Sequence, residues 1–87
     1  MKILIVEDEQ ALATGLRFNF EQEGYEVQLA GDGATALKLF ENAAPKFDVV
    51  TLDLMLPGMS GYEVCREIRD RDDSVSILVL SVRTLSE

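Results

Sequence analysis

Asp48-Val-Val-Thr-Leu-Asp53-Leu-Met-Leu-Pro-Gly-Met-Ser-Gly61 is the stretch that decides the fold of this 87-residue chain. Residues 48–52 predict a buried strand, because β-branched and apolar side chains follow one another without polar alternation. The strand runs into a carboxylate, Asp53, and a proline and two glycines interrupt regular structure just beyond it. A charged side chain at the end of an apolar strand needs water, a cation or hydrogen-bond donors. Taken alone, Asp53 can equally be a residue that caps the strand or the following turn.

A second acidic cluster follows the first predicted strand. Residues 2–6 form another short apolar run, and it stops at Glu7-Asp8-Glu9. In an open parallel sheet, ligands bind outside the carboxyl ends of the strands, where the strand order reverses. If the first and third strands are neighbours, Glu7, Asp8 and Asp53 converge on one pocket, where they repel one another and raise their pKa values. A divalent cation relieves that repulsion, and carboxylates with a backbone carbonyl and water suit Mg²⁺.

The rest of the chain alternates helix and strand signals. We expect strands over 2–7, 25–29, 48–53 and 75–80, and helices over about 9–23, 33–44 and 60–71. Asp32 is placed to cap the second helix, and Ser60 with Glu63 has the spacing of a capping box for the third. The apolar side of the third helix is expected to contain Tyr62, Val64, Cys65 and Ile68. This alternation predicts an α/β sheet with right-handed crossovers.

These motifs resemble the receiver domain of two-component response regulators, most closely the subfamily with a winged-helix DNA-binding domain. The resemblance rests on the strand that ends in Glu7-Asp8-Glu9 and on residues 52–61, and it covers essentially all 87 residues. It implies a flavodoxin-like, doubly wound parallel sheet with strand order 2-1-3-4. It also implies a role in two-component signal transduction, in which a sensor histidine kinase is the phosphodonor.

The same resemblance implies a role for each site residue. Asp53 matches the phospho-acceptor, and Glu7 and Asp8 match the acidic pair that holds Mg²⁺ together with Asp53. The backbone carbonyl of Met55 is implied as a further metal ligand. Ser81, at the end of the fourth predicted strand, matches the hydroxyl switch residue of the family.

The chain departs from the family pattern after this strand. Complete receivers continue with a fourth helix, a fifth strand that ends in a lysine contacting the phosphoryl group, and a fifth helix. None of the three lysines is expected at the carboxyl end of a central strand. We therefore expect residues 1–87 to be a receiver domain shortened after its fourth strand. Residues 77–80 are apolar at successive positions, which predicts self-association there or pairing with a complementary fragment.

Composition narrows the function. Sixteen acidic against eight basic residues give a net charge of −8, which argues against contact with nucleic acid or an anionic membrane. The absence of histidine excludes His-based acid–base and zinc chemistry, and Cys65, the only cysteine, fits a reducing compartment. No signal peptide is expected, and no apolar stretch approaches the roughly 20 residues of a membrane span. We expect a cytoplasmic protein.

Two alternative functions remain open. A phosphohydrolase with an aspartyl-phosphate intermediate usually carries a second Asp two residues after the nucleophile, where this chain has Met55. We therefore expect no enzyme in the usual sense, but a phospho-acceptor that assists its own phosphorylation. The other alternative is a non-switching assembly module with a vestigial acidic pocket, because the lysine of the family is missing.

Overall fold

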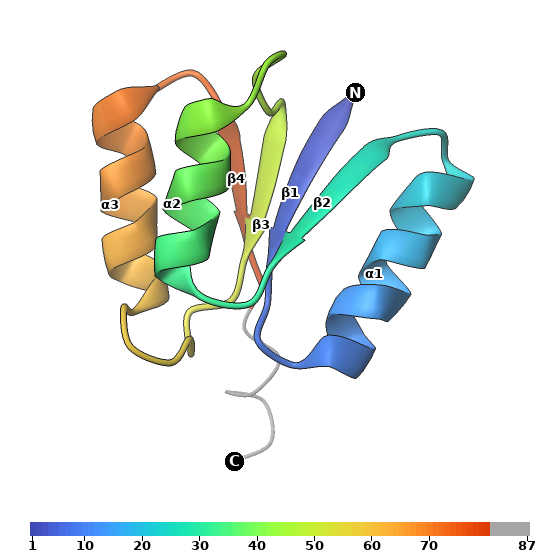
Figure 1. Cartoon of the computed structure of the whole chain (residues 1–87), viewed down its shortest axis with the longest axis horizontal. Helices are drawn as coiled ribbons and strands as arrows, with labels where there is room; N and C mark the ends of the chain where they lie inside the picture. The colour runs from blue at the N-terminus through green and yellow to red at the C-terminus, as the bar shows by residue number, and fades with distance from the viewer. Residues whose placement is uncertain (81–87) are drawn as a thin grey trace.

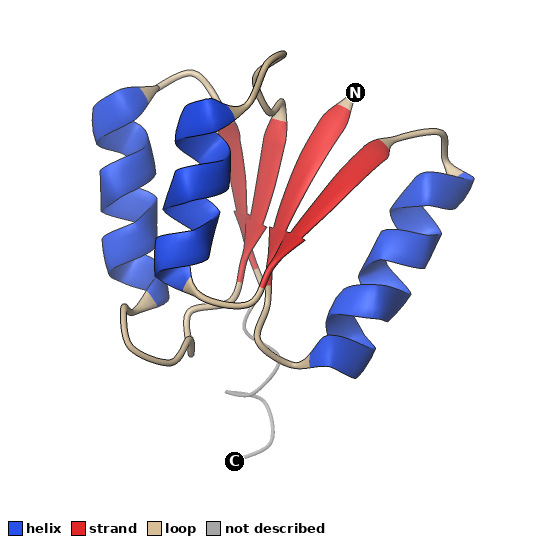
Figure 2. Cartoon of the chain, viewed as in Figure 1, coloured by secondary structure: helices blue, strands red, loops and turns tan. Residues whose placement is uncertain are grey.

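The computed structural model describes residues 1–80, in which strands and helices alternate. In chain order the elements are β1 (Lys2–Val6), α1 (Gln10–Gln22), β2 (Glu26–Ala30), α2 (Gly33–Asn42), β3 (Val49–Leu52), α3 (Gly61–Arg71) and β4 (Ser76–Val79). The strands form one parallel sheet in the order β2-β1-β3-β4 (Figures 1 and 2). The structure thus confirms the predicted α/β fold and the strand order 2-1-3-4.

The register of the sheet brings the strand ends to one level. Val6, the last residue of β1, lies beside Ala30 of β2 on one side and Leu52 of β3 on the other. Because the strands are parallel, the residues that follow them leave the sheet at the same edge. Glu7 follows β1 and Asp53 follows β3, so the two predicted acidic segments share that edge.

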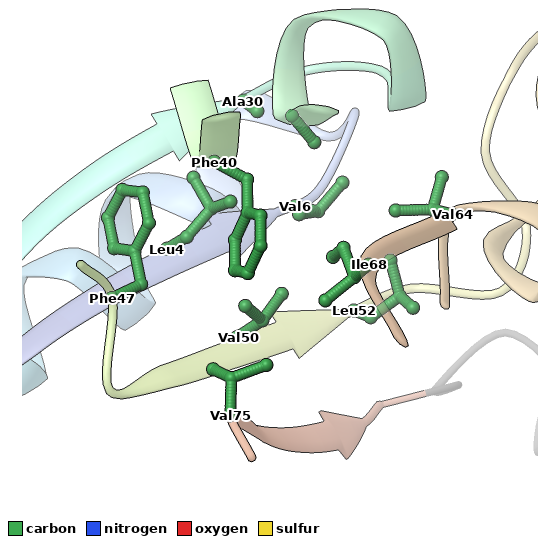
Figure 3. Packing of buried hydrophobic residues seen from close by; sticks show 11 residues of the cluster. Leu4, Val6, Ala30, Phe40, Phe47, Val50, Leu52, Val64, Ile68 and Val75 are labelled. Carbon is green, nitrogen blue, oxygen red and sulfur yellow. The ribbon is translucent and has the colours of Figure 1, made fainter. Parts of the chain in front are cut away.

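The main core lies between the sheet and the pair α2 and α3, which lie side by side on one face (Figure 1). Alternate side chains of β1 and β3 point to this face, as the two-residue period of a strand requires. Figure 3 shows them packed against side chains of the two helices, and the buried set includes Leu4, Val6, Phe40, Val50, Leu52, Val64 and Ile68. Burying each large aliphatic side chain contributes about 1.5–3 kcal/mol, so this layer fixes how the helices sit on the sheet.

A smaller core lies on the opposite face, under α1. Ile3, Ile5 and Val27 are buried there against Leu16 and Phe20 of the helix. The cover does not extend to the last strand, because Leu78, which lies beside Thr51 on this face, is 52% exposed. Within residues 1–80, β4 is therefore an edge strand with an open apolar surface.

The starts of α2 and α3 are fixed by the predicted caps. Asp32 accepts a 2.8 Å hydrogen bond from the backbone N–H of Thr35. Ser60 and Glu63 form the capping box, in which each side chain accepts the backbone N–H of the other at 3.2 Å. Capping thus places the first turn of each helix independently of the core.

The position predicted for Tyr62 is wrong. Its side chain is 72% exposed, whereas Val64 and Ile68 are fully buried. Tyr62 lies two residues before Val64 and therefore about 200° around the helix from it. The face that meets the sheet is set by the two aliphatic residues, and the tyrosine points to solvent.

The longest of the described helices, α1, has 13 residues. Among residues 1–80, no helix combines the length and the apolar character that crossing a membrane requires.

Candidate metal centre

Three carboxylates meet at the carboxyl edge of the sheet. Glu7 and Asp8 follow β1 and Asp53 follows β3, and one oxygen of each lies within 4.8 Å of the others. Glu7 is 7% and Asp53 is 4% exposed, so two of the three acidic groups are largely removed from bulk water. The structure thus brings together the three carboxylates that the sequence pointed to.

Hydrogen bonds of the sheet continue into these segments. The backbone N–H of Asp53 donates to the carbonyl oxygen of Val6 at 3.1 Å, and that of Glu7 donates to Ala30 at 2.9 Å. Each bond extends a strand ladder by one residue. The main chain of both acidic residues is therefore held by hydrogen bonds that continue the sheet.

Backbone donors also hold the two buried carboxylates. The N–H of Met55 donates to Asp53 Oδ1 at 2.9 Å, and the N–H of Glu9 donates to Glu7 Oε2 at 3.0 Å. In each case the donor lies two residues after the acid, and the bond restricts how the carboxylate can rotate. Sequence analysis missed these donors, because every residue except proline carries a backbone N–H and its direction leaves no trace in the sequence.

The donor set suits a hard divalent cation. Its side-chain ligands are carboxylate oxygens, which Mg²⁺ prefers, and two oxygens on opposite sides of Mg²⁺ are about 4.2 Å apart. The observed limit of 4.8 Å approaches that separation, so a small adjustment of the side chains closes the site around an ion. Asp8 is less buried than Glu7 and Asp53, which leaves room for the several waters that Mg²⁺ keeps. The residues present therefore fit the predicted metal.

A hollow of about 340 Å³ adjoins the acidic residues on the side of α1. It lies between the segment that follows β1 and the end of β2, and it is lined by Glu7, Asp8, Gln10, Ala13, Thr14, Leu29, Ala30 and Gly31. The hollow thus borders two of the three acidic residues, Glu7 and Asp8, whereas Asp53 is not part of its lining.

The two other predicted site residues are Met55 and Ser81. Met55, whose carbonyl is predicted to bind the metal, lies in the loop after β3, and its side chain is 54% exposed. Ser81, the predicted switch residue, lies outside the described residues.

Comparisons with known proteins bear on the fold and the site. The sensory transduction protein RegX3 of Mycolicibacterium smegmatis is 48% identical over 81 residues, which are 93% of this chain and 34% of RegX3. The response regulator protein TrrA from Thermotoga maritima, in a crystal structure in complex with Mg²⁺ and BeF, is 38% identical with a TM-score of 0.87. That match covers 93% of this chain and 69% of the TrrA chain.

This chain is also similar to TrrA in a second crystal structure, in which TrrA is in complex with the histidine kinase ThkA. There the identity is 39% and the TM-score 0.85, with 92% of this chain and 67% of that chain covered. The chain spans about a third of the length of the curated relative RegX3. The family described as response regulator receiver domain matches residues 3–87. This chain therefore belongs to the receiver domain family of response regulators.

Proposed function

We propose that residues 1–87 are a receiver module that accepts a phosphoryl group on Asp53, with Mg²⁺ at the adjoining acidic site, in two-component signal transduction. The observation that carries the proposal is the convergence of Glu7, Asp8 and Asp53, with one oxygen of each within 4.8 Å of the others. The presence of Mg²⁺ and BeF in the TrrA crystal structure supports the same type of site in this family.

In the proposed reaction, a carboxylate oxygen of Asp53 attacks the phosphorus atom of the donor. The new oxygen–phosphorus bond forms as the bond to the leaving group breaks, and the leaving group departs with the electron pair. Met55 contributes by holding Asp53 Oδ1 through its backbone N–H, which fixes the plane of the attacking carboxylate.

The acidic neighbours of Asp53 have a different role in this proposal. Glu7 and Asp8 hold the cation together with Asp53 and the carbonyl oxygen of Met55. When bound, Mg²⁺ supplies positive charge that offsets the repulsion between the carboxylates and the phosphoryl oxygens. The Ser81 hydroxyl is proposed to hydrogen-bond the phosphorylated side chain.

A sensor histidine kinase is the proposed phosphodonor. The complex of TrrA with the histidine kinase ThkA supports this, because TrrA shares 39% of its residues with this chain over the matched part. Direct contact of this chain with nucleic acid is not proposed, since its net charge of −8 repels phosphates.

We further propose that β4 mediates self-association or pairing with a complementary fragment. The side chains of Leu78, Val79 and Leu80 are 52%, 49% and 38% exposed, and the strand contains no lysine or proline to block pairing. Burying such apolar surface contributes about 25 cal/mol per Å², so a few hundred Å² is a substantial part of the stability of so small a domain.

The two alternative functions have weaker support. A phosphohydrolase needs an acid–base group beside Asp53, and Met55, two residues later, cannot supply one from its side chain. A non-switching assembly module remains the second alternative, and it rests on the exposed surface of β4.

Incubation of the chain with acetyl phosphate and Mg²⁺ tests the proposal against both alternatives. We expect the intact mass, measured at mildly acidic pH, to increase by one phosphoryl group, and we expect Asp53→Asn or EDTA to prevent the increase. Asp48→Asn is the matched control, because Asp48 is exposed at the opposite end of β3. An unmodified wild-type chain would favour the assembly module, and phosphate release without an adduct would favour the hydrolase.

A further inference from the structure

The first residue of α3 lies unusually close to the segment that carries the phospho-acceptor. Gly61 is buried, and its backbone N–H donates to the carbonyl oxygen of Leu54 at 3.1 Å. A Cβ atom at position 61 would lie 2.5 Å from the Cα atom of Leu54 and 2.6 Å from the carbonyl oxygen of Asp53. Both are backbone atoms, so no rotation of a side chain relieves the clash. Any side chain at this position forces either α3 or the loop to move.

The helix is the better anchored of the two. The capping box of Ser60 and Glu63 fixes the first turn of α3, and the fully buried Val64 and Ile68 attach the helix to the sheet. The loop after Asp53 is held less firmly, because its core contacts come from the only partly buried Leu56 and Met59, and the Met55 side chain is 54% exposed. A side chain at position 61 therefore displaces the loop, while the helix stays in place.

This loop contains the hydrogen bond that orients Asp53, from the N–H of Met55 to Oδ1 at 2.9 Å. We infer that Gly61 is a positioning residue for the phospho-acceptor site. Its lack of a side chain lets α3 hold residues 53–55 in the geometry that this hydrogen bond requires. The relevance of this role to phosphorylation rests on the proposed function, whereas the geometric role can be tested by itself.

Gly33 offers a matched control in the neighbouring helix. It is the first residue of α2, it is buried, and it also follows a capping residue. A Cβ atom at this position would lie 2.7 Å from Val64 Cγ2, 3.0 Å from Met59 Cβ and 3.1 Å from Met59 Sδ, which are all side-chain atoms. Gly33→Ala thus crowds the start of a helix as Gly61→Ala does, but without touching the backbone of residues 53–55.

The experiment compares Gly61→Ala with Gly33→Ala in a chain that carries Gly15→Ala. Gly15 lies inside α1, where an added Cβ meets nothing within 4 Å, so we expect alanine there to stabilise the helix and to offset part of the stability lost in either variant. Hydrogen exchange of the Met55 amide is measured by NMR without metal. We expect exchange to be about tenfold faster in Gly61→Ala, as for the loss of one hydrogen bond to a charged group, and unchanged in Gly33→Ala.

A Mg²⁺ titration of the same variants gives a second measurement. Followed at residues 7–9, it should give a dissociation constant about tenfold higher in Gly61→Ala, which is the size of effect expected when a metal ligand loses its supporting contact. Adding Leu54→Ala removes the 3.1 Å contact between Leu54 Cδ2 and the new Cβ atom, but it leaves the clash with the backbone. It should therefore not restore the Mg²⁺ affinity or the Met55 amide protection of Gly61→Ala.

Three results would overturn the role of Gly61. The first is unchanged exchange of the Met55 amide in Gly61→Ala, and the second is recovery of wild-type exchange and Mg²⁺ affinity when Leu54→Ala is added. The third is failure of Gly61→Ala to fold in the stabilised chain, which would make the glycine a requirement of the whole fold. A wild-type chain that shows no Mg²⁺ response at residues 7–9 would contradict the proposed function instead. In that case amide exchange would still decide the role of Gly61.

Discussion

The backbone N–H of Asp53 donates a 3.1 Å hydrogen bond to the carbonyl oxygen of Val6. This bond extends the pairing of β1 with β3 by one residue and joins the two segments that carry the acidic groups. Glu7 follows Val6 directly, so the sheet itself sets the separation between the Glu7 and Asp53 main chains. A site held by strands is more precise than one held by loops, and a metal centre needs that precision.

Mg²⁺ binding should depend on the carboxylates at this edge. We expect Glu7→Gln to raise the Mg²⁺ dissociation constant by at least about tenfold, because it replaces a charged oxygen ligand by a neutral amide. NMR titration of the wild-type chain should perturb residues 7–9 and 53–55 first. The acidic turn at the half-buried Asp72 and the exposed Asp73 is the internal control. If the largest shifts appear in that turn, the pocket has been placed wrongly.

The cap of α2 should make stability depend on pH in the acidic range. Hydrogen bonds from Thr35 lower the pKa of Asp32 below its usual value of about 3.9. Because the pKa is lower in the folded state, the cap stabilises the fold above the pKa of the unfolded chain, and this stabilisation is lost as the pH falls through the folded value.

Asp32→Asn keeps a capping oxygen but cannot titrate. We therefore expect the free energy of unfolding of this variant to depend less on pH than that of the wild type below about pH 4. Denaturant titrations at a series of pH values measure this dependence. Identical pH dependence in both chains would show that the hydrogen bonds to Asp32 do not favour its charged form.

The capping box of α3 should contribute measurably to stability. Ser60→Ala removes the oxygen that accepts the N–H of Glu63, and we expect the free energy of unfolding to fall by about 1 kcal/mol. Ser60→Asp, which restores an acceptor at the same position, should recover most of the loss. Urea denaturation of the three chains gives the comparison. Equal stability of Ser60→Ala and the wild type would mean that packing alone fixes the start of the helix.

Self-association through β4 should be sensitive to charge on that strand. Leu78→Lys places a charge on its exposed apolar surface, and we expect the weight-average mass in sedimentation at micromolar concentration to fall toward that of the monomer. Phe18→Lys is the control, because Phe18 is 60% exposed on α1, away from the strand. A wild-type chain that is monomeric at every concentration, with cooperative unfolding, would rule out this assembly.

Local sequence signals predicted the parts of this fold that depend on local physics. The apolar run before Asp53 identified β3, and Ser60 with Glu63 identified the start of α3. Both signals depend only on residues that are close together in the sequence. The convergence of Glu7 with Asp53 needed one further step, the rule that parallel strands present their carboxyl ends at one edge.

Features that arise from contacts distant in sequence, or from backbone direction, could not be predicted in this way. Helical spacing already places Tyr62 about 200° from Val64, but only the packing of Val64 and Ile68 against the sheet shows which of these two sides of α3 is buried. The N–H of Met55 that reaches Asp53 depends on how the loop turns. The close approach of Gly61 to the same loop depends on the placement of α3, so the glycine was recognised only as an interruption of regular structure.

Chemical mapping of the phosphorylated residue tests the central claim most directly. After reaction with acetyl phosphate and Mg²⁺, borohydride reduction converts an aspartyl phosphate to homoserine, and peptide mass spectrometry locates the changed residue. We predict that the change lies at residue 53 alone, and that Asp53→Asn shows none. Modification at Asp8 or at another carboxylate, or a wild-type chain that remains unmodified, would contradict the assignment of Asp53 as the phospho-acceptor.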